Sequence, residues 1–186
     1  MTGGRDTRDD RPAVSSRVLL VSGQRLDPRS IERAIRDHHG REIDAVVGVL
    51  ADCSASDWLS VWAETPVRTT TIDVETCTRS TSRTAEQPTA PSAQASLSDI
   101  SERLLDSFDT QEGQMVCCLH SLSTLLERFE REHVFRFVHA VGVLAARHGE
   151  ACYLTMNASR QDAATTEVFS TICDVVRVDR GDTTPS

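Results

Sequence analysis

The sequence predicts an α/β domain of three layers, in which helices cover both faces of a mainly parallel β-sheet. Two observations lead to this fold class. Short apolar runs, many of them β-branched, alternate with longer segments whose apolar residues recur at helical spacing. The runs are apolar on both faces, as in strands buried between two layers of helices. At 186 residues the chain is long enough for one domain with a substantial core.

The first strand–helix unit follows residues 1–16, a polar stretch that we expect to be a disordered tail. A strand over Val18–Val21 is followed by Ser22 and Gly23, which favour a turn. The next helix is predicted from its end signals. Asp27 suits the N-cap, Pro28 the first helical position and Gly40 the position just after the helix.

Two more strands are predicted in IDAVVGVLAD (residues 43–52) and VRTTTIDV (67–74), with the helix SASDWLSVWAE (54–64) between them. The composition then changes, because residues 77–96 are rich in Ser, Thr, Ala and Pro. We expect a flexible insert there that interrupts the domain without dividing it.

The second half of the chain continues the alternation. A helix in LSDISERLLDSF (97–108) is predicted with Ser98 as its cap, followed by a strand in QMVCCLHS (114–121). Residues 123–149 are predicted to be helical, in one or two pieces. Then come a strand in ACYLTM (151–156), a helix in RQDAATTEVFSTI (160–172) and a sixth strand in DVVRVDR (174–180). The predicted domain spans residues 17–179, and residues 180–186 form a polar tail.

The charged residues exclude several functions. All 20 basic residues are arginine, against 28 acidic residues, which gives a formal charge of -8. Without lysine the chain has neither a Schiff-base amine nor the phosphate-binding lysine of a P-loop. The acidic balance argues against general nucleic-acid binding, which needs a basic surface. Both a GC-rich genome and the cytosol of a halophile account for arginine in place of lysine, and composition alone does not separate them.

The compartment is expected to be the cytoplasm. The N-terminal residues lack the apolar core of a signal peptide, and no apolar run approaches the roughly 20 residues of a membrane span. The six cysteines include no CxxC pair, and we expect them to be reduced and mostly buried, with Cys117 and Cys118 packing against the two helical layers.

The turn after the first strand has the register of a P-loop but not its residues. In GQRLDPRS, Gly23 and Ser30 stand at two of the four defining positions of G-x-x-x-x-G-K-[ST]. Pro28 takes the place of the second glycine and Arg29 that of the lysine. Proline has no N–H to offer a phosphate, and the longer, planar arginine cannot reach the phosphates as lysine does. An ordinary turn before a helix is the simpler interpretation.

The stretch MVCCLHSLSTLL (115–126) resembles the Walker B segment of RecA-like and KaiC-like ATPases, an apolar strand that ends in Asp and is followed by Ser and a Leu-rich helix. Here His120 stands in place of the Asp, and Ser121 is retained. A carboxylate at that position serves Mg²⁺, which prefers oxygen ligands. Neutral imidazole is a poor substitute, and imidazolium repels the ion.

More specifically, CLHSLSTLLERFEREHVFRFVHAVGVL (118–144) resembles an uncharacterised family of halophilic archaea. The resemblance covers residues 17–179 and is strongest from Val116 to Leu144. It implies a RecA-like P-loop NTPase-type core without a working P-loop, and it favours the halophile as the reason for the missing lysine. No activity is established for that family.

These observations predict a non-catalytic RecA/KaiC-like domain that acts as an interaction or regulatory module, with no cofactor and no metal. We expect protein partners, with self-association left open, and neither nucleic acid nor membrane. The alternative is a nucleotide or anion sensor that uses Gly23, Arg29, Ser30, His120 and Ser121 without hydrolysis. A zinc site of Cys118 and His120 with Cys53 or Cys152 is a weaker hypothesis, because the spacing matches no established site. The simplest role for His120 is a hydrogen bond to a neighbouring loop.

Overall fold

The computed structural model describes residues 17–75, 79–81 and 96–179. The predicted tails at 1–16 and 180–186, and most of the predicted insert at 77–96, lie outside the described residues. Along the chain the elements are β1 (Arg17–Ser22), α1 (Pro28–His39), β2 (Ala45–Leu50), α2 (Ala55–Trp62), β3 (Arg68–Asp73), β4 (Arg79–Thr81), α3 (Leu97–Thr110), β5 (Met115–His120), α4 (Leu122–Arg128), α5 (Arg131–Arg147), β6 (Ala151–Asn157), the 3₁₀ turn η1 (Ala158–Arg160), α6 (Ala163–Thr171) and β7 (Val175–Asp179).

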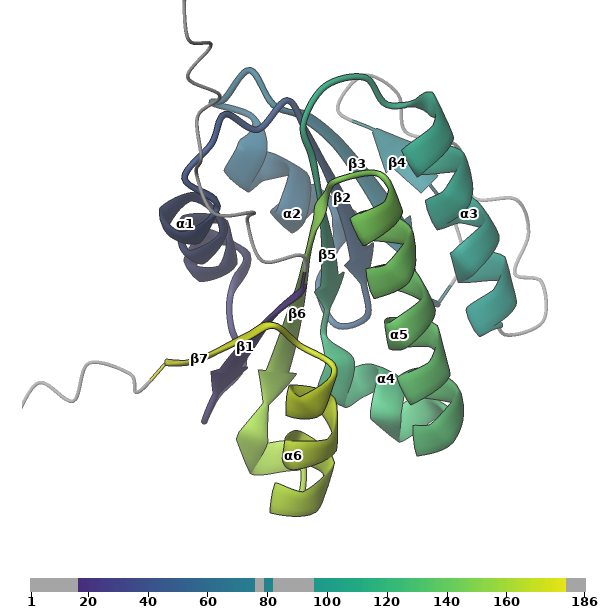
Figure 1. Ribbon diagram of the computed structural model, residues 1–186. Coiled ribbons are helices and arrows are strands. Elements are labelled where there is room, and N and C mark those ends of the chain that lie inside the picture. The colour runs from purple at the N-terminus through teal and green to yellow at the C-terminus, as the bar shows by residue number, and fades with distance from the viewer. Residues whose placement is uncertain (1–16, 76–78, 82–95, 180–186) are drawn as a thin grey trace, which may run out of the picture.

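The strands form one sheet in the order β4-β3-β2-β5-β6-β1-β7. Six of them are parallel, and only β4 runs antiparallel, next to β3. Helices cover both faces of this twisted sheet (Figure 1). The predicted three-layer α/β class with a mainly parallel sheet is confirmed, and the arrangement is consistent with a RecA-like core.

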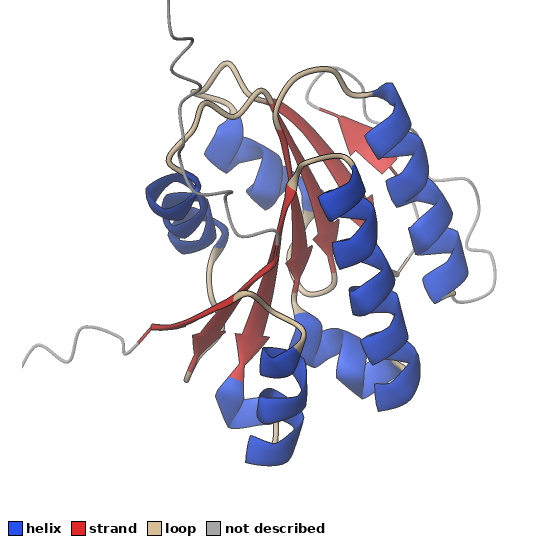
Figure 2. Ribbon diagram, viewed as in Figure 1, coloured by secondary structure: helices blue, strands red, loops and turns tan. Residues whose placement is uncertain are grey.

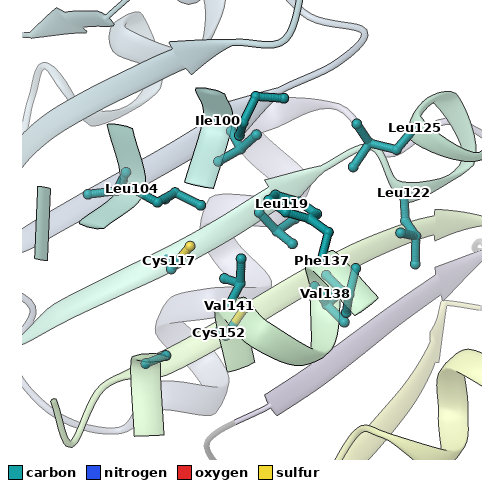
Figure 3. Packing of buried hydrophobic residues seen from close by; sticks show 14 of the residues in the cluster. Ile100, Leu104, Cys117, Leu119, Leu122, Leu125, Phe137, Val138, Val141 and Cys152 are labelled. Carbon is teal, nitrogen blue, oxygen red and sulfur yellow. The ribbon is translucent and has the colours of Figure 1, made fainter. Parts of the chain in front are cut away.

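Two hydrophobic clusters, one on each face, hold the layers together. α1 and α2 pack on one face, and α3, α4, α5 and α6 on the other (Figure 2). Because neighbouring side chains of a strand point to opposite faces, the adjacent Cys117 and Cys118 enter different clusters, as predicted. Figure 3 shows the larger cluster, where Ile100 and Leu104 of α3 and Val138 and Val141 of α5 surround Cys117 and Leu119 of β5.

The structure corrects the predicted start of α3. Ser96, and not Ser98, is its N-cap, because the Ser96 hydroxyl accepts a hydrogen bond from the Asp99 N–H and the Asp99 carboxylate accepts one from the Ser96 N–H. This reciprocal pair is a capping box, and it requires an acidic or amide side chain three residues after the cap. Ser98 has no such residue at that spacing.

Two further details differ from or refine the sequence reading. Three residues of the predicted insert form β4 against β3. The predicted helical stretch at 123–149 is two helices, α4 and α5, because the backbone of Phe129 is extended and that of Glu130 is not helical. Across the described residues, no helix has both the length and the apolar character needed to cross a lipid bilayer.

The topology defines where a ligand or partner site is expected. β1 and β6 are neighbours in the sheet, yet β1 leads to α1 on one face and β6 leads to α6 on the other. In open α/β sheets the crevice for a ligand lies at the carboxyl ends of such strands. The loops after β1, β2, β5 and β6 meet at this edge.

Candidate functional site

His120 ends β5 and is almost fully buried, with 1% of its side chain exposed. Its Nδ1 lies 3.1 Å from Asp52 Oδ1, and its Nε2 lies 3.1 Å from the Leu26 carbonyl oxygen. The ring also lies against the indole of Trp58, with 6.1 Å between ring centroids. An acceptor beside each ring nitrogen is the environment of an imidazolium, which donates from both nitrogens.

The pKa of His120 follows from these contacts. Burial alone lowers the pKa of a histidine, but the Asp52 carboxylate, Cys53 and the Leu26 carbonyl outweigh burial and raise the pKa to about 10. His120 Nδ1 and Asp52 Oδ1 are close but poorly aligned, and neither atom has a well-formed hydrogen bond. Charge therefore holds the pair together more than hydrogen-bond geometry does.

Asp52 is the centre of the cluster. It lies two residues beyond β2, where the register pairs Leu50 with His120, and 17% of its side chain is exposed. Arg25 Nε lies 3.6 Å from Oδ1, Arg160 Nη1 lies 3.6 Å from Oδ2, and the Thr124 hydroxyl donates to Oδ2 at 3.3 Å. Burial alone raises the pKa of the carboxyl, but His120, Arg25 and Thr124 together lower it below its usual value.

Arg160 extends the cluster to the surface. Its guanidinium forms two hydrogen bonds with the Glu127 carboxylate, of which the bond from Nε to Oε1 measures 2.9 Å. Arg160 comes from η1 and Glu127 from α4, so this pair joins the loop after β6 to the helix after β5. Asn157 and Ser123 connect the same two segments, because the Asn157 N–H donates to the Ser123 hydroxyl at 3.0 Å.

The loop after β1, residues 23–27, is fixed at three points. The Ser159 hydroxyl donates to the Gly23 carbonyl, Arg25 donates to the Asp52 backbone carbonyl, and the Leu26 carbonyl accepts from His120. Gly23 itself is exposed and does not have the positive φ that would require glycine. The predicted hydrogen bond between His120 and a neighbouring loop is present, and that loop is the one after β1.

The N-terminus of α1 holds an anion from the chain itself. Asp27 is the N-cap, as predicted, and its Oδ1 accepts hydrogen bonds from the N–H groups of Arg29 at 2.9 Å and Ser30 at 3.0 Å. The Ser30 hydroxyl donates to Asp27 Oδ2 at 2.7 Å. The side-chain hydrogen bond from Ser30 is the largest cause that lowers the pKa of Asp27. The amides with which a P-loop helix would bind phosphate are therefore engaged by a carboxylate.

The predicted candidate residues do not converge on one pocket. His120 and the Gly23–Asp27 loop meet around Asp52, whereas Arg29 is exposed on the first turn of α1. Ser30 lines a hollow between α1 and β7 instead. Ser121 is buried, follows His120 through a cis peptide bond and precedes α4, and its side chain makes no capping hydrogen bond.

The arrangement restricts the chemistry of this edge. A general base needs a ring nitrogen that is free to accept a proton, and both nitrogens of His120 face acceptors. A divalent cation near Asp52 would meet the positive charges of Arg25, Arg160 and His120. Among the described residues, no group of three or more His, Cys, Asp or Glu side chains is placed to hold a metal ion. Cys152 belongs to the opposite cluster from Cys118, so these two thiols cannot share a ligand set with His120.

Sequence reasoning identified His120 as a residue that bonds a neighbouring loop but missed Arg25, Arg160 and Glu127. Arg25 lies three residues after β1, and Arg160 lies three residues after β6. Their positions after the carboxyl ends of parallel strands were the available signal, because arginine is common throughout this chain and its residue type carries no information.

The chain matches a family of unknown function, DUF7504, over residues 15–177. The chain belongs to that family. In this DUF7504 chain the match begins just before β1 and ends within β7, so it covers every described element before β7, the first part of β7 and every residue of the cluster around Asp52. A comparison with curated proteins finds no match.

Proposed function

We propose that this DUF7504 chain is a non-catalytic domain of the RecA/KaiC type, a degenerate P-loop ATPase core that acts as an interaction or regulatory module. The observation that carries the proposal is the occupation of both halves of the nucleotide site by groups of the chain itself. Asp27 takes the amides at the start of α1, and the His120 imidazolium stands where a Walker B carboxylate would serve Mg²⁺.

The start of α1 is poorly suited to bind phosphate. A phosphate at the N-terminus of α1 would have to displace the Asp27 carboxylate and then lie close to its negative charge. Pro28 contributes no N–H to the first turn. The loop that precedes the helix is also fixed by Ser159, Arg25 and His120, so it has little freedom to wrap around a ligand.

The surroundings of His120 are poorly suited to bind Mg²⁺. Raising the pKa of His120 to about 10 keeps the ring cationic at neutral pH. Its charge is balanced by Asp52, which leaves that carboxylate committed to three cations. ATP hydrolysis of this type relies on positioning Mg²⁺ and the phosphates, and neither is supported by the residues present.

The alternative, a nucleotide or anion sensor without hydrolysis, would draw on exposed guanidinium groups. Arg25 and Arg29 both reach solvent beside the β1–α1 loop. Arg25 is already paired with Asp52, however, and Arg29 extends from the helix turn that Asp27 caps. The geometry therefore favours the interaction module.

Isothermal titration with ATP and Mg²⁺ tests the proposal. The wild-type chain is expected to show no binding and no phosphate release. Asp27→Gly frees the two amides at a cost of only a few tenths of a kcal/mol to the cap, whereas Asp27→Asn keeps the cap and removes the charge. Weak phosphate binding by the glycine variant alone would show that the carboxylate blocks the site. Mg²⁺-dependent ATP binding with turnover by the wild type would overturn the proposal.

The proposed setting is the cytosol of a halophilic archaeon. It rests on the complete replacement of lysine by arginine and on the charge of -8. Such an adaptation predicts that the free energy of unfolding rises as KCl is increased to molar concentration, when repulsion between acidic groups is screened. A stability that is constant or falls over this range would count against it.

A further inference from the structure

β7 forms one edge of the sheet and pairs only with β1 among the described strands. It is also the most exposed strand, with 42% of Val176 and 62% of Val178 accessible to solvent. Its place beyond β1 at the margin of the fold is visible in Figure 1. An exposed edge strand with apolar side chains can pair with another chain, and proteins usually shield such an edge.

The charged residues of β7 alternate with these valines. Arg177 and Asp179 face α1, where they line a hollow of about 530 Å³ together with Arg33 and Asp37. Arg177 lies close enough to His38 for its charge to contribute, after burial, to the lowered pKa of that histidine. The strand therefore presents one positive and one negative side chain, two residues apart, on the same face.

We propose that β7 pairs antiparallel with β7 of a second copy of this chain, about a two-fold axis through Val178. In this register each Val178 faces its counterpart, and Arg177 lies directly opposite the partner's Asp179. A two-fold axis requires the same surface to complement itself, and an ordered pair of opposite charges two residues apart does so. Residues 177–179 of the two strands then pair with each other and join the two sheets.

The charges select this register over its neighbours. A two-fold axis through Arg177 or through Asp179 would place like charges directly opposite each other, which destabilises an antiparallel pair. An axis through Val176 would place neither Arg177 nor Asp179 opposite a charge of the other sign on the partner strand. The Val178 register forms two ion pairs and covers the most exposed large apolar side chain of the described residues.

Sedimentation equilibrium of the full chain tests the pairing, at about 0.15 M salt, where the Debye length is still about 8 Å. The wild type is expected to dimerise. Arg177→Asp and Asp179→Arg each give β7 two charges of one sign, so each variant alone is expected to dissociate at least tenfold more readily. An equimolar mixture of the two is expected to form heterodimers, because a strand with two acidic side chains then meets one with two basic side chains.

The double variant R177D/D179R is a control for effects of the two substitutions on folding. It is expected to dimerise with itself but not with the wild type, because a mixed pair would set like charges opposite each other. Circular dichroism confirms that each variant is folded. The proposal would be overturned if the wild type stayed monomeric up to about 1 mM, the millimolar end of the affinity scale. That result would indicate that another segment, or the charges themselves, prevent β7 from pairing with a second chain. A dimer that neither single variant weakens, or a mixture that stays monomeric, would also overturn it.

Discussion

Alkaline pH is expected to destabilise this protein through His120, whose ring lies between the Asp52 carboxylate and the Leu26 carbonyl. The pKa of His120 is about 10 in the folded state and about 6.5 in an unfolded chain. Because the folded-state pKa is the higher one, the folded state retains the proton. The resulting stabilisation is complete below about pH 6.5 and is lost as the pH rises through 10.

The size of the effect follows from the difference of about 3.5 between the two pKa values. One pKa unit corresponds to about 1.4 kcal/mol, so the protonation of His120 contributes about 5 kcal/mol to the free energy of unfolding at low pH, and all of it is lost once the pH is above about 10. Between about pH 7 and pH 9 the expected loss is about 2 to 3 kcal/mol. The side chain is 1% exposed, so solvent screening does not reduce this figure appreciably.

Urea unfolding at pH 7, 8 and 9, followed by tryptophan fluorescence, measures this loss. His120→Gln removes the titrating group, and the pair H120Q/D52N removes both charges so that no carboxylate is left without its partner. Burial raises the pKa of Cys118 and of Tyr153 as well, and these groups also weaken the fold at high pH. They are the same in all three proteins, so the difference between the curves isolates His120.

Parallel curves for the wild type and the variants would refute the reasoning, because they would mean that His120 carries no proton in the folded state. Nitrogen chemical shifts of the histidine side chains give an independent check. One imidazolium is expected to persist at pH 8 and to disappear in His120→Gln.

Three further predictions concern stability. Gly48→Ala is expected to lower the free energy of unfolding by about 1 to 3 kcal/mol, because the new Cβ would lie 2.7 Å from Trp58 Nε1. Urea unfolding with tryptophan fluorescence measures this loss, and an unchanged midpoint would contradict the close approach. Ser96→Ala is expected to lower the free energy of unfolding by about 1 kcal/mol, because the α3 cap is lost. Ser98→Ala is expected to change it by no more than about 0.5 kcal/mol. Equal shifts in the melting temperature of the two variants would contradict the capping box. Burial, Arg41 and His38 lower the pKa of the buried His39, so below about pH 6.5 the unfolded chain takes up a proton that the folded chain resists. His39→Leu is therefore expected to be less sensitive to acid than the wild type between about pH 7 and pH 5, by up to about 1 kcal/mol for each pH unit.

The sequence predicted the structure best where a single residue type determines the local backbone conformation. Asp27, Pro28 and Gly40 mark the ends of α1 through side-chain capping, a fixed φ and a left-handed backbone, and each of these depends on one residue type. The alternation of apolar runs with helical patterns likewise follows from burial between two layers. Ser98 was chosen over Ser96 because a serine alone does not identify a cap, and the deciding residue is Asp99 at the third helical position.

The cluster around Asp52 was harder to predict because its contacts are between distant segments. The sequence indicated that His120 would bond a loop, but not that Asp52 would approach from β2 and raise its pKa. That approach depends on the pairing of Leu50 with His120 in neighbouring strands. Arg160 joins Asp52 across more than one hundred residues of chain, and no periodicity or spacing in the sequence encodes such a contact.

The three hydrogen bonds that fix the β1–α1 loop affect how a partner protein would bind to it. A protein that docks on this loop would find its shape already set by Ser159, Asp52 and His120, so the loop would not need to rearrange on binding. With a partner that is itself rigid, association is then expected at about 10⁵ to 10⁷ M⁻¹s⁻¹, and differences in affinity between such partners should arise mainly in their dissociation rates.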